Sequence, residues 1–312
     1  MRLQSGARCR KLILAVALGL VVAGCGSAGA GNGGDAGAEG SGETLTVGAI
    51  PDQNPQELQR RYGKFARYLS DKLGVDVRYE PVTDYTAAVT AFRRGDLDLV
   101  FFGGLTGVQA TLQVPGAEPI AQRAMDANFH SVFIANTDTH IAPINRVAGL
   151  DALAGHSFTF GSKVSTSGRL MPQYFLAQAG VHLDDFAGQV GFSGSHDKTI
   201  KLVEAGTYEA GALNEAVWKD RKKAGQIDTS KVRVVFRTPP YHDYHWVIGP
   251  QADERFGKGF TQRVTDALLA LDGSSTRERE ILDLFQAEKF IPTSPDNYQC
   301  IEKVARRIGL VQ

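Results

Sequence analysis

Cysteine is scarce in this chain of 312 residues, of which only three are Cys. Cys9 and Cys25 lie within or directly after an N-terminal segment typical of an export signal, so only Cys300 remains in the folded part. A disulfide within that part is therefore excluded, and with it a disulfide-stabilised scaffold. We expect Cys300 to be a small apolar side chain on a terminal helix, with a reactive thiol as the alternative.

A long hydrophobic run is also missing. The longest apolar run covers residues 12–23, whereas a helix that crosses a bilayer needs about 20 residues. A membrane-spanning channel or transporter is therefore excluded. The chain has 34 basic and 34 acidic side chains, so it lacks a charge excess. Because four of the cations and none of the acids fall in residues 1–24, the remainder has a formal charge of −4, which argues against a nucleic-acid partner.

The N-terminus does contain the pattern of an export signal. Cations precede the apolar run, and the sequence Val22-Ala23-Gly24-Cys25 that ends it resembles a lipobox. These features predict a signal peptide over residues 1–24, a lipid on Cys25 and a flexible Gly-rich linker through residue 43. We expect an extracytoplasmic protein, lipid-anchored to the cell membrane on its periplasmic face or at the cell surface. The alternative is a buried helix with an accidental Cys.

The folded part alternates between strand and helix patterns, which predicts an α/β fold with mostly parallel sheets covered by helices. Strands are expected at residues 45–50, 75–79, 97–102, 130–135, 157–161, 189–192, 210–213, 232–236 and 246–248. Helices are expected at residues 56–73, 85–94, 169–179, 198–204, 261–271, 277–284 and 298–308. The economical arrangement has two lobes and a ligand cleft between them. Residues 44–136 and 241–312 form lobe 1, residues 137–240 form lobe 2, and the hinges lie near residues 133–137 and 240–246.

A turn rich in hydroxyl groups is the strongest candidate site. Ser165, Thr166 and Ser167 follow a predicted strand and precede a predicted helix, and Gly168 comes next. Unpaired N–H groups and the helix dipole suit the start of a helix to an anion, and the hydroxyls add donors. Plain N-capping is the alternative, because Ser and Thr begin many helices that bind nothing. The sequence leaves these two readings about equal.

A second polar turn, residues 191–197, has the same place between a strand and a helix. His196 can donate to an oxyanion, or with Asp197 serve as a general base in a hydrolase. The nucleophile-elbow pattern G-x-S-x-G fails here, since Ser195 stands where Gly is required. A solvated helix cap is the remaining alternative.

Polar and aromatic side chains are dense in residues 238–246. His242, Asp243 and His245 suggest a metal, but His-x-x-His in a loop lacks helical facing, so we expect no metal site. Core packing, where a loop enters a strand, is the alternative to a site role for Tyr244 and Trp246. Two further turns, at residues 84–85 and 102–106, follow predicted lobe 1 strands at the end where open α/β sheets form their ligand crevice.

Taken in order, these segments resemble one family. The lipobox, the strand from Leu45, the Asp84-Tyr85 turn, the run from Gly95 to Gly104 and the turns at residues 165–168 and 193–197 are similar to the phosphonate- and phosphite-binding periplasmic components of ABC importers. The resemblance is strongest to a selenate-binding branch, through residues 103–107, 166–172 and 239–246. It implies a two-lobe periplasmic binding protein fold of type II, with an oxyanion held between the lobes.

The resemblance also implies the site and its partners. The implied ligand contacts are Tyr85, Gly104, Ser165, Thr166, Ser167, His196, Asp243 and Tyr244. Gly103-Gly104 stands where the phosphonate proteins usually have Gly-Pro and a pocket aromatic, which argues against a bulky amine arm on the ligand. We therefore expect a monomeric solute-binding protein without catalysis or cofactor, which gives selenate to an ABC permease and its ATPase. The alternatives are a phosphonate, phosphite or phosphate ligand, a sensor partner of a membrane kinase, and a secreted hydrolase or phosphatase.

Overall fold

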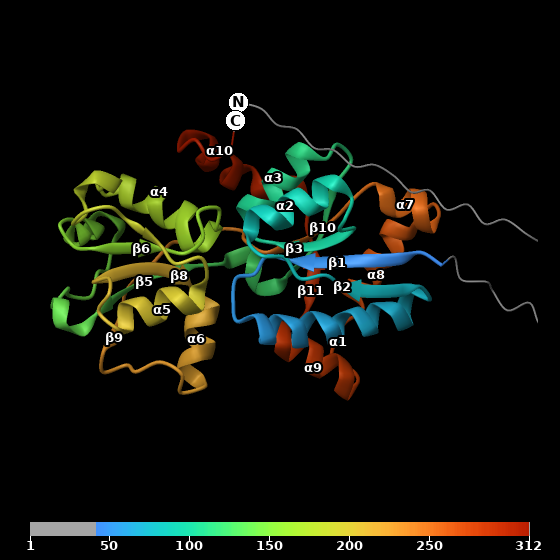
Figure 1. The fold of residues 1–312 in the computed structure, drawn as a ribbon, viewed down its shortest axis with the longest axis horizontal. Helices are drawn as coiled ribbons and strands as arrows, with labels where there is room; N and C mark the ends of the chain where they lie inside the picture. Colours follow the sequence, from blue (N-terminus) through green and yellow to red (C-terminus); the bar gives the residue numbers. More distant parts are fainter. Residues whose placement is uncertain (1–41, 312) are drawn as a thin grey trace, which may run out of the picture. The chain divides into compact units, whose positions relative to one another are not determined.

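Two β-sheets organise the protein, each with helices on both faces (Figure 1). The computed structural model describes residues 42–311, which belong to one compact unit. Strand order is β11-β4-β10-β3-β1-β2 in the six-stranded sheet and β7-β6-β8-β5-β9 in the other. Lobe 1 is the six-stranded sheet with its helices, and lobe 2 is the five-stranded sheet with its own. The predicted two-lobe α/β architecture is confirmed.

Lobe 1 is built from two stretches of the chain. The first contains β1 (Thr44–Ala49), α1 (Pro55–Leu73), β2 (Asp76–Tyr79), α2 (Tyr85–Arg94), β3 (Leu99–Phe102), α3 (Gly104–Gln113) and β4 (Glu118–Arg123). The second contains β10 (His245–Ile248), α7 (Gln251–Phe256), α8 (Phe260–Leu269), α9 (Thr276–Phe285), β11 (Phe290–Pro292) and α10 (Gln299–Arg307). Strand β1 is parallel to β2 and β3, whereas β10 is antiparallel to β3 and β4. Helices α2 and α3 lie on one face of this sheet, and α1 and α9 on the other (Figure 1).

Lobe 2 is the stretch between them. It contains β5 (Ser131–Asn136), β6 (Phe158–Phe160), α4 (Met171–Gln178), β7 (Gly191–Phe192), α5 (His196–Glu204), β8 (Ala210–Asn214), α6 (Glu215–Lys223) and β9 (Val232–Arg237). A π-helical turn, Thr166–Leu170, leads directly into α4. Helix α4 covers one face of the sheet, and α5 and α6 cover the other (Figure 1).

The chain first crosses from lobe 1 to lobe 2 earlier in the sequence than the predicted boundary at residue 136. Strand β5 pairs with β8 and β9, so residues 131–136 belong to the lobe 2 sheet and the chain crosses before Ser131. The return crossing lies beside it, because Phe129 and Tyr241 form a β-bridge. Every residue of β5 is buried, so its sequence has no alternation to indicate which sheet it joins. Hinge motion at these crossings stays a prediction.

Aromatic packing fills the core of lobe 1. The ring of Trp246 stacks on Phe65 at 4.7 Å between centroids and lies 5.0 Å from Phe101. His245, on the same strand, packs 3.8 Å from the ring of Tyr298 and against α3 at Gly107. A methyl group at Gly107 would lie 2.1 Å from Nε2 of His245, so the absent side chain lets the imidazole reach the helix.

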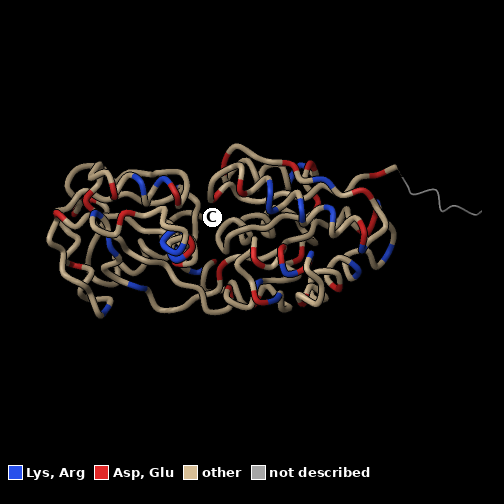
Figure 2. Tube along the Cα trace, turned by 90° about the horizontal axis from the view of Figure 1, so that it is seen from below, with Lys and Arg blue, Asp and Glu red and all other residues tan. Residues whose placement is uncertain are grey.

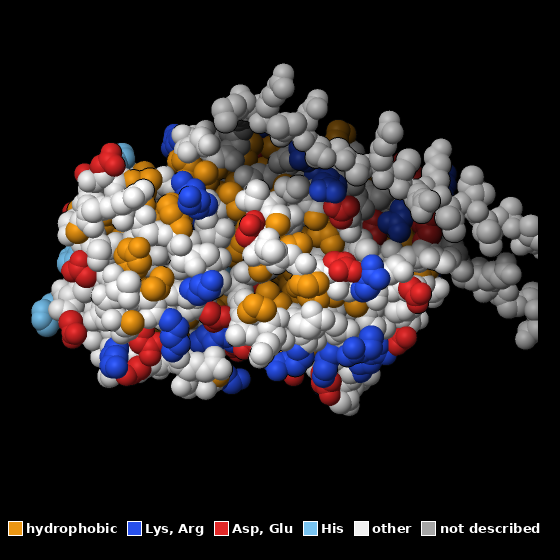
Figure 3. Space-filling view, viewed as in Figure 1, with side chains coloured by type: hydrophobic (Ala, Val, Ile, Leu, Met, Phe, Trp, Pro, Cys, Tyr) orange, Lys and Arg blue, Asp and Glu red, His pale blue; other side chains and the backbone are white. Residues whose placement is uncertain are grey.

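The surface agrees with the balanced composition. Basic and acidic residues are interspersed over both lobes (Figure 2), and the described side chains on the face in Figure 3 also carry both signs. Cys300 is exposed on α10, which contradicts the expected apolar packing: Ile301, Val304 and Ala305 form the buried face of that helix. Among the helices of residues 42–311, none is both long and apolar enough to cross a membrane.

Candidate anion-binding site

The three hydroxyls of the Ser165–Ser167 turn have three different roles. Ser165 caps the π-helical turn, since its Oγ accepts a hydrogen bond from the N–H of Gly168 at 2.9 Å, so the capping alternative is confirmed for this residue. Thr166 Oγ1 accepts from the N–H of Leu105 on α3 at 2.9 Å and so joins the lobes. Ser167 Oγ is buried and has no hydrogen-bond partner.

Gly168 allows a close backbone approach, but to its own lobe. Its carbonyl accepts from the N–H of Gly161 at 2.8 Å, at the end of β6. A methyl group on Gly168 would lie 2.9 Å from Ser165 Oγ and 3.1 Å from the Cα of Gly161. The glycine therefore seats the hydroxyl turn on the end of the strand.

Asp243 lies opposite this turn, in the loop before β10. Its Oδ1 accepts from the N–H of Gly104 at the start of α3, at 2.9 Å, whereas its Oδ2 is buried without a partner. Burial raises the pKa of Asp243 to about 7, and nearby Asp126 adds to the rise, although the Gly104 N–H opposes it. At neutral pH this carboxyl therefore exchanges readily between its neutral and ionised forms. The backbone N–H of Gly104, a predicted ligand contact, thus donates to the carboxyl group of Asp243.

Tyr85 is the first residue of α2, which Asp84 caps by accepting from the N–H of Ala87 at 2.8 Å. Its ring is fully buried and its hydroxyl has no hydrogen-bond partner. Burial raises the pKa of Tyr85 well above its ordinary value, and Asp52 and Asp243 add to the rise. The Ser165 hydroxyl lies close enough to oppose this shift, but its geometry does not form a hydrogen bond. The phenol is therefore a protonated donor.

Three of the residues predicted to contact the ligand have buried polar atoms without partners, and they come from three segments. Tyr85 Oη comes from lobe 1, Ser167 Oγ from lobe 2 and Asp243 Oδ2 from the loop that joins them. Buried polar atoms normally have partners, so such a group indicates a ligand. Two hydroxyl donors and one carboxyl match a tetrahedral oxyanion that keeps a proton. Among the described residues, the other buried side-chain atoms without a partner are nitrogens of Arg61, Arg233 and Trp246.

His196 and Tyr244, also predicted to contact the ligand, are bonded to each other. The N–H of Asn214 donates to Nδ1 of His196 at 3.4 Å, which leaves Nε2 protonated and 3.2 Å from the Tyr244 hydroxyl. Tyr244 in turn donates to Oδ2 of Asp52 at 2.8 Å. Burial lowers the pKa of His196, so the imidazole is neutral. This chain of hydrogen bonds joins the lobes beside the site, and direct contact of either residue with an anion stays a prediction.

Asp197 does not pair with His196. Its carboxylate instead binds Arg221 and accepts from the N–H of Asn54 at 2.8 Å. The histidine–aspartate base of the hydrolase alternative is therefore not assembled. Burial lowers the pKa of His245 to about 4, and its Nδ1 contacts the carbonyl of Asp243. Residues 42–311 contain no group of three or more His, Cys, Asp or Glu placed to hold a metal ion.

Two residues at the lobe contact were missed in the sequence. Asp52 comes three residues after the end of β1, near a strand end of the kind that predicted the turns at residues 84–85 and 102–106, so the same rule could have found it. Arg221 lies on α6, which the sequence pattern did not predict. Nothing in the local sequence distinguishes it from its basic neighbours.

Comparison with known proteins places the chain in a family. Residues 47–298 match the family described as ABC transporter, phosphonate, periplasmic substrate-binding protein. The chain belongs to this family. It is 48% identical over 271 residues to the probable ABC transporter phosphite binding protein PhnD1 of Prochlorococcus marinus, covering 86% of this chain and 91% of the relative.

A solved structure of PhnD1 from Prochlorococcus marinus, in complex with methylphosphonate, matches with a TM-score of 0.85 and 47% identity, covering 87% of this chain and all of that one. The phosphate-import protein PhnD of Mycolicibacterium smegmatis is 27% identical and covers 64% of each chain. Family membership makes this chain an extracytoplasmic solute-binding component of an ABC transporter, and its relatives are binding proteins rather than enzymes.

Proposed function

We propose that this protein binds a small phosphorus oxyanion, phosphite or methylphosphonate, and delivers it as a monomer to an ABC permease and its ATPase. The observation that carries the proposal is that three predicted contact residues hold polar atoms buried without partners: Tyr85 Oη, Ser167 Oγ and Asp243 Oδ2. The relatives named for phosphite and phosphate import support the same ligand class. The family's description as a transporter favours import over the sensor alternative.

Selenate is the ligand expected from the sequence, and a phosphorus oxyanion takes its place. Two relatives are named for phosphite and phosphate, and the solved PhnD1 structure is a complex with methylphosphonate, so these proteins support the alternative of a phosphorus oxyanion. The chemistry of Asp243 favours the same choice. Selenate and sulfate carry no proton near pH 7, so an ionised Asp243 repels them, whereas a phosphorus oxyanion can share a proton with that carboxyl.

The surroundings of the site favour a ligand without a long arm. A methyl group on Gly103 would lie 3.2 Å from Oγ1 of Thr166, and one on Gly104 would lie 3.4 Å from the carbonyl of His242. The start of α3 therefore packs directly against both the hydroxyl turn and the loop of Asp243. An ammonium arm, as in 2-aminoethylphosphonate, would have to separate these segments.

Isothermal titration calorimetry tests the ligand class. The purified protein is titrated with methylphosphonate, phosphite, phosphate, selenate, sulfate and 2-aminoethylphosphonate at pH 7. We expect methylphosphonate or phosphite to bind most tightly. Tighter binding of selenate than of every phosphorus compound would overturn the proposal.

Removing the unpartnered hydroxyl of Ser167 should weaken binding without unfolding the protein. A hydrogen bond to a charged group contributes about 1.5–3 kcal/mol, so Ser167→Ala should bind methylphosphonate with a free energy less favourable by that amount. Thermal unfolding of the ligand-free variant should match the unsubstituted protein, because no protein hydrogen bond is lost. Ser193→Ala is the matched control, since the hydroxyl of Ser193 has its hydrogen bonds with Ser195 and Thr199. Equal affinities of both variants would place the anion elsewhere.

We also propose that Cys25 carries the lipid that anchors the protein. The lipobox lies outside the described residues, so the support is its sequence. Cells that express the full chain should incorporate labelled palmitate into it, and Cys25→Ala should abolish the label and release the protein from the membrane fraction. A labelled Cys25→Ala variant would contradict this assignment.

A further inference from the structure

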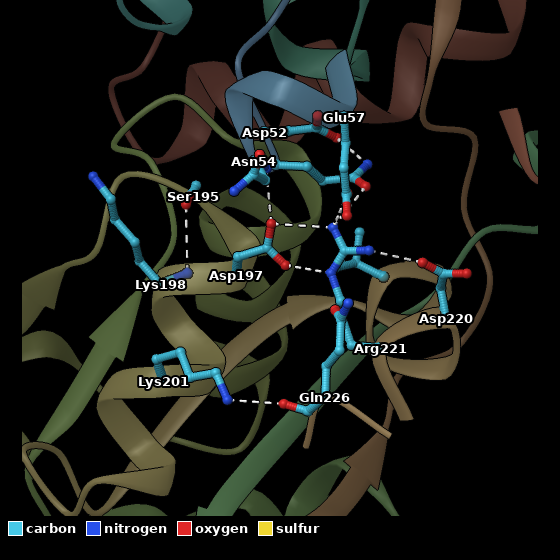
Figure 4. Close-up of polar contacts among 12 residues, drawn as sticks. Asp52, Asn54, Glu57, Ser195, Asp197, Lys198, Lys201, Asp220, Arg221 and Gln226 are labelled. Carbon is cyan, nitrogen blue, oxygen red and sulfur yellow. Dashed lines mark hydrogen bonds and ion pairs between the residues drawn. The ribbon is translucent and has the colours of Figure 1, made fainter. Parts of the chain in front are cut away.

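A buried arginine joins the two lobes beside the anion site. Arg221 lies on α6 of lobe 2, and its side chain is only 8% exposed (Figure 4). Within lobe 2 its Nε donates to Oδ1 of Asp197 at 2.7 Å, and its Nη1 donates to Oδ2 of Asp220 at 2.8 Å. Across the interface its Nη2 donates to the carboxylate of Glu57, on α1 of lobe 1. One guanidinium thus holds carboxylates from both lobes.

Further bonds cross the interface at the same place. Asn54, which caps α1, donates its backbone N–H to Oδ2 of Asp197 at 2.8 Å. Nη2 of Arg221 also lies 3.5 Å from Oε1 of Gln53. We name this set of residues, Gln53, Asn54, Glu57, Asp197 and Arg221, the interlobe latch. It forms one wall of a cleft of about 530 Å³ lined by both lobes.

The latch is prepared within lobe 2. Burial acts to lower the pKa of Arg221, but hydrogen bonding and attraction from Asp197 and Glu57 outweigh it and raise the pKa. When the lobes separate, Arg221 keeps Asp197 and Asp220 and loses only its lobe 1 partners. Little rotamer freedom remains to be lost on closure, since Asp197 alone already holds the guanidinium through both Nε and Nη2.

The latch and the anion site share two short segments. Asp52 supports the site through Tyr244, and its neighbours Gln53 and Asn54 belong to the latch. In lobe 2, His196 faces the site and Asp197 faces the latch. The N–H of His196 donates to the carbonyl of Asp52 at 3.0 Å and ties the two segments together. The lobes therefore cannot close on an anion without also closing the latch.

We propose that the Glu57–Arg221 link sets the ligand affinity of this protein from outside the ligand site, by stabilising the closed arrangement of the lobes. The inference rests on the proposed function, because it concerns the same bound anion. Apparent affinity is proportional to the fraction of protein in the binding-competent state, so a weaker latch lowers affinity with every ligand contact intact. The loss falls mainly on the dissociation rate.

The net charge of the protein, taken alone, predicts the opposite change in ligand affinity. Glu57→Gln removes a negative charge, which should strengthen the attraction of the protein for an anion. Asp220→Asn removes the same charge and also weakens a contact of Arg221, but Asp220 is on the same helix as the arginine. The two variants therefore separate a link across the lobes from a change in charge.

Calorimetry and stopped-flow kinetics with methylphosphonate test the proposal. We expect Glu57→Gln to bind about tenfold more weakly, through faster dissociation, and Asp220→Asn to stay within about twofold of the unsubstituted protein. Arg221→Lys should resemble Glu57→Gln, because an ammonium cannot replace the planar fork. Equal affinity of Glu57→Gln and Asp220→Asn would overturn the latch.

Small-angle X-ray scattering of the ligand-free proteins gives an independent measure. Glu57→Gln should have a larger radius of gyration than Asp220→Asn, because a larger fraction of its molecules is open. Equal radii would overturn the latch even if affinities differ. Failure of the unsubstituted protein to bind any phosphorus oxyanion would instead overturn the proposed function, and the scattering comparison would still decide the latch.

Discussion

Asp243→Asn is expected to remove the pH dependence of methylphosphonate binding between about pH 6 and 8.5. Burial raises the pKa of Asp243 to about 7, and its Oδ2 is free to meet the ligand. Below pH 7 the carboxyl is protonated and donates to an anion oxygen. Above pH 7 either the carboxyl or the anion must take up a proton on binding, so affinity should fall up to about tenfold per pH unit. An amide donates at every pH.

The same substitution should change which anions bind. At pH 8 the ionised Asp243 repels selenate and sulfate, whereas the introduced side-chain amide would offer them an N–H donor while its carbonyl still accepts from Gly104. We therefore expect Asp243→Asn to gain selenate binding relative to the unsubstituted protein. Calorimetry at several pH values, in buffers of different ionisation enthalpy, measures both affinity and proton uptake. Parallel pH profiles for the two proteins would contradict this role of Asp243.

The stability of the ligand-free protein provides a control, because the direction of its change with pH follows from the pKa of Asp243. The folded pKa of Asp243 is raised above its usual value, so the folded state binds more protons than the unfolded state from about pH 4 to pH 7. The contribution of this group to stability is therefore fully present at low pH and is lost as the pH rises through 7. Asp243→Asn should unfold at a temperature that depends less on pH over that window.

Local sequence signals predicted most of the fold. Helix α2 begins and ends at the predicted residues, because Asp84 caps it and Gly95 adopts the left-handed conformation that ends it. Helix α3 was missed because Gly103, Gly104 and Gly107 resemble a turn. Those glycines serve tertiary packing against Asp243, Thr166 and His245, which a local pattern does not contain.

The site was predictable where its chemistry is local. The Ser165–Ser167 turn could be found because a strand, three hydroxyls and a helix start are consecutive in the sequence. The different roles of those hydroxyls depend on distant partners: Thr166 accepts from Leu105, which is 61 residues away. The partners of His196 and Arg221 likewise come from other elements, at separations of 48 and 164 residues for Tyr244 and Glu57. Residue type and spacing in the sequence do not indicate such contacts.

The largest loss of stability is expected from Asp126→Asn, because it breaks a fully buried ion pair. Asp126 is inaccessible to solvent, and Arg123 is 5% exposed. Two parallel bonds of 2.7 Å join the guanidinium to both carboxylate oxygens, and the guanidinium lies 5.1 Å from the ring centroid of Tyr244. Removing one partner leaves a buried charge unpaired, which costs about 3–5 kcal/mol. Urea unfolding of the ligand-free protein measures this loss.

Arg237→Gln is the matched control, since Arg237 makes the same two-bond contact with Glu215 at a side chain that is half exposed. That substitution should cost at most about 1 kcal/mol. Similar losses for the two variants would show that burial does not govern the Arg123–Asp126 pair. The pair also positions the site, because the carbonyl of Asp126 accepts from the N–H of Asp243 at 3.1 Å. Any Asp126→Asn protein that stays folded should therefore bind methylphosphonate more weakly, since the loop that carries Asp243 has lost its rigid support.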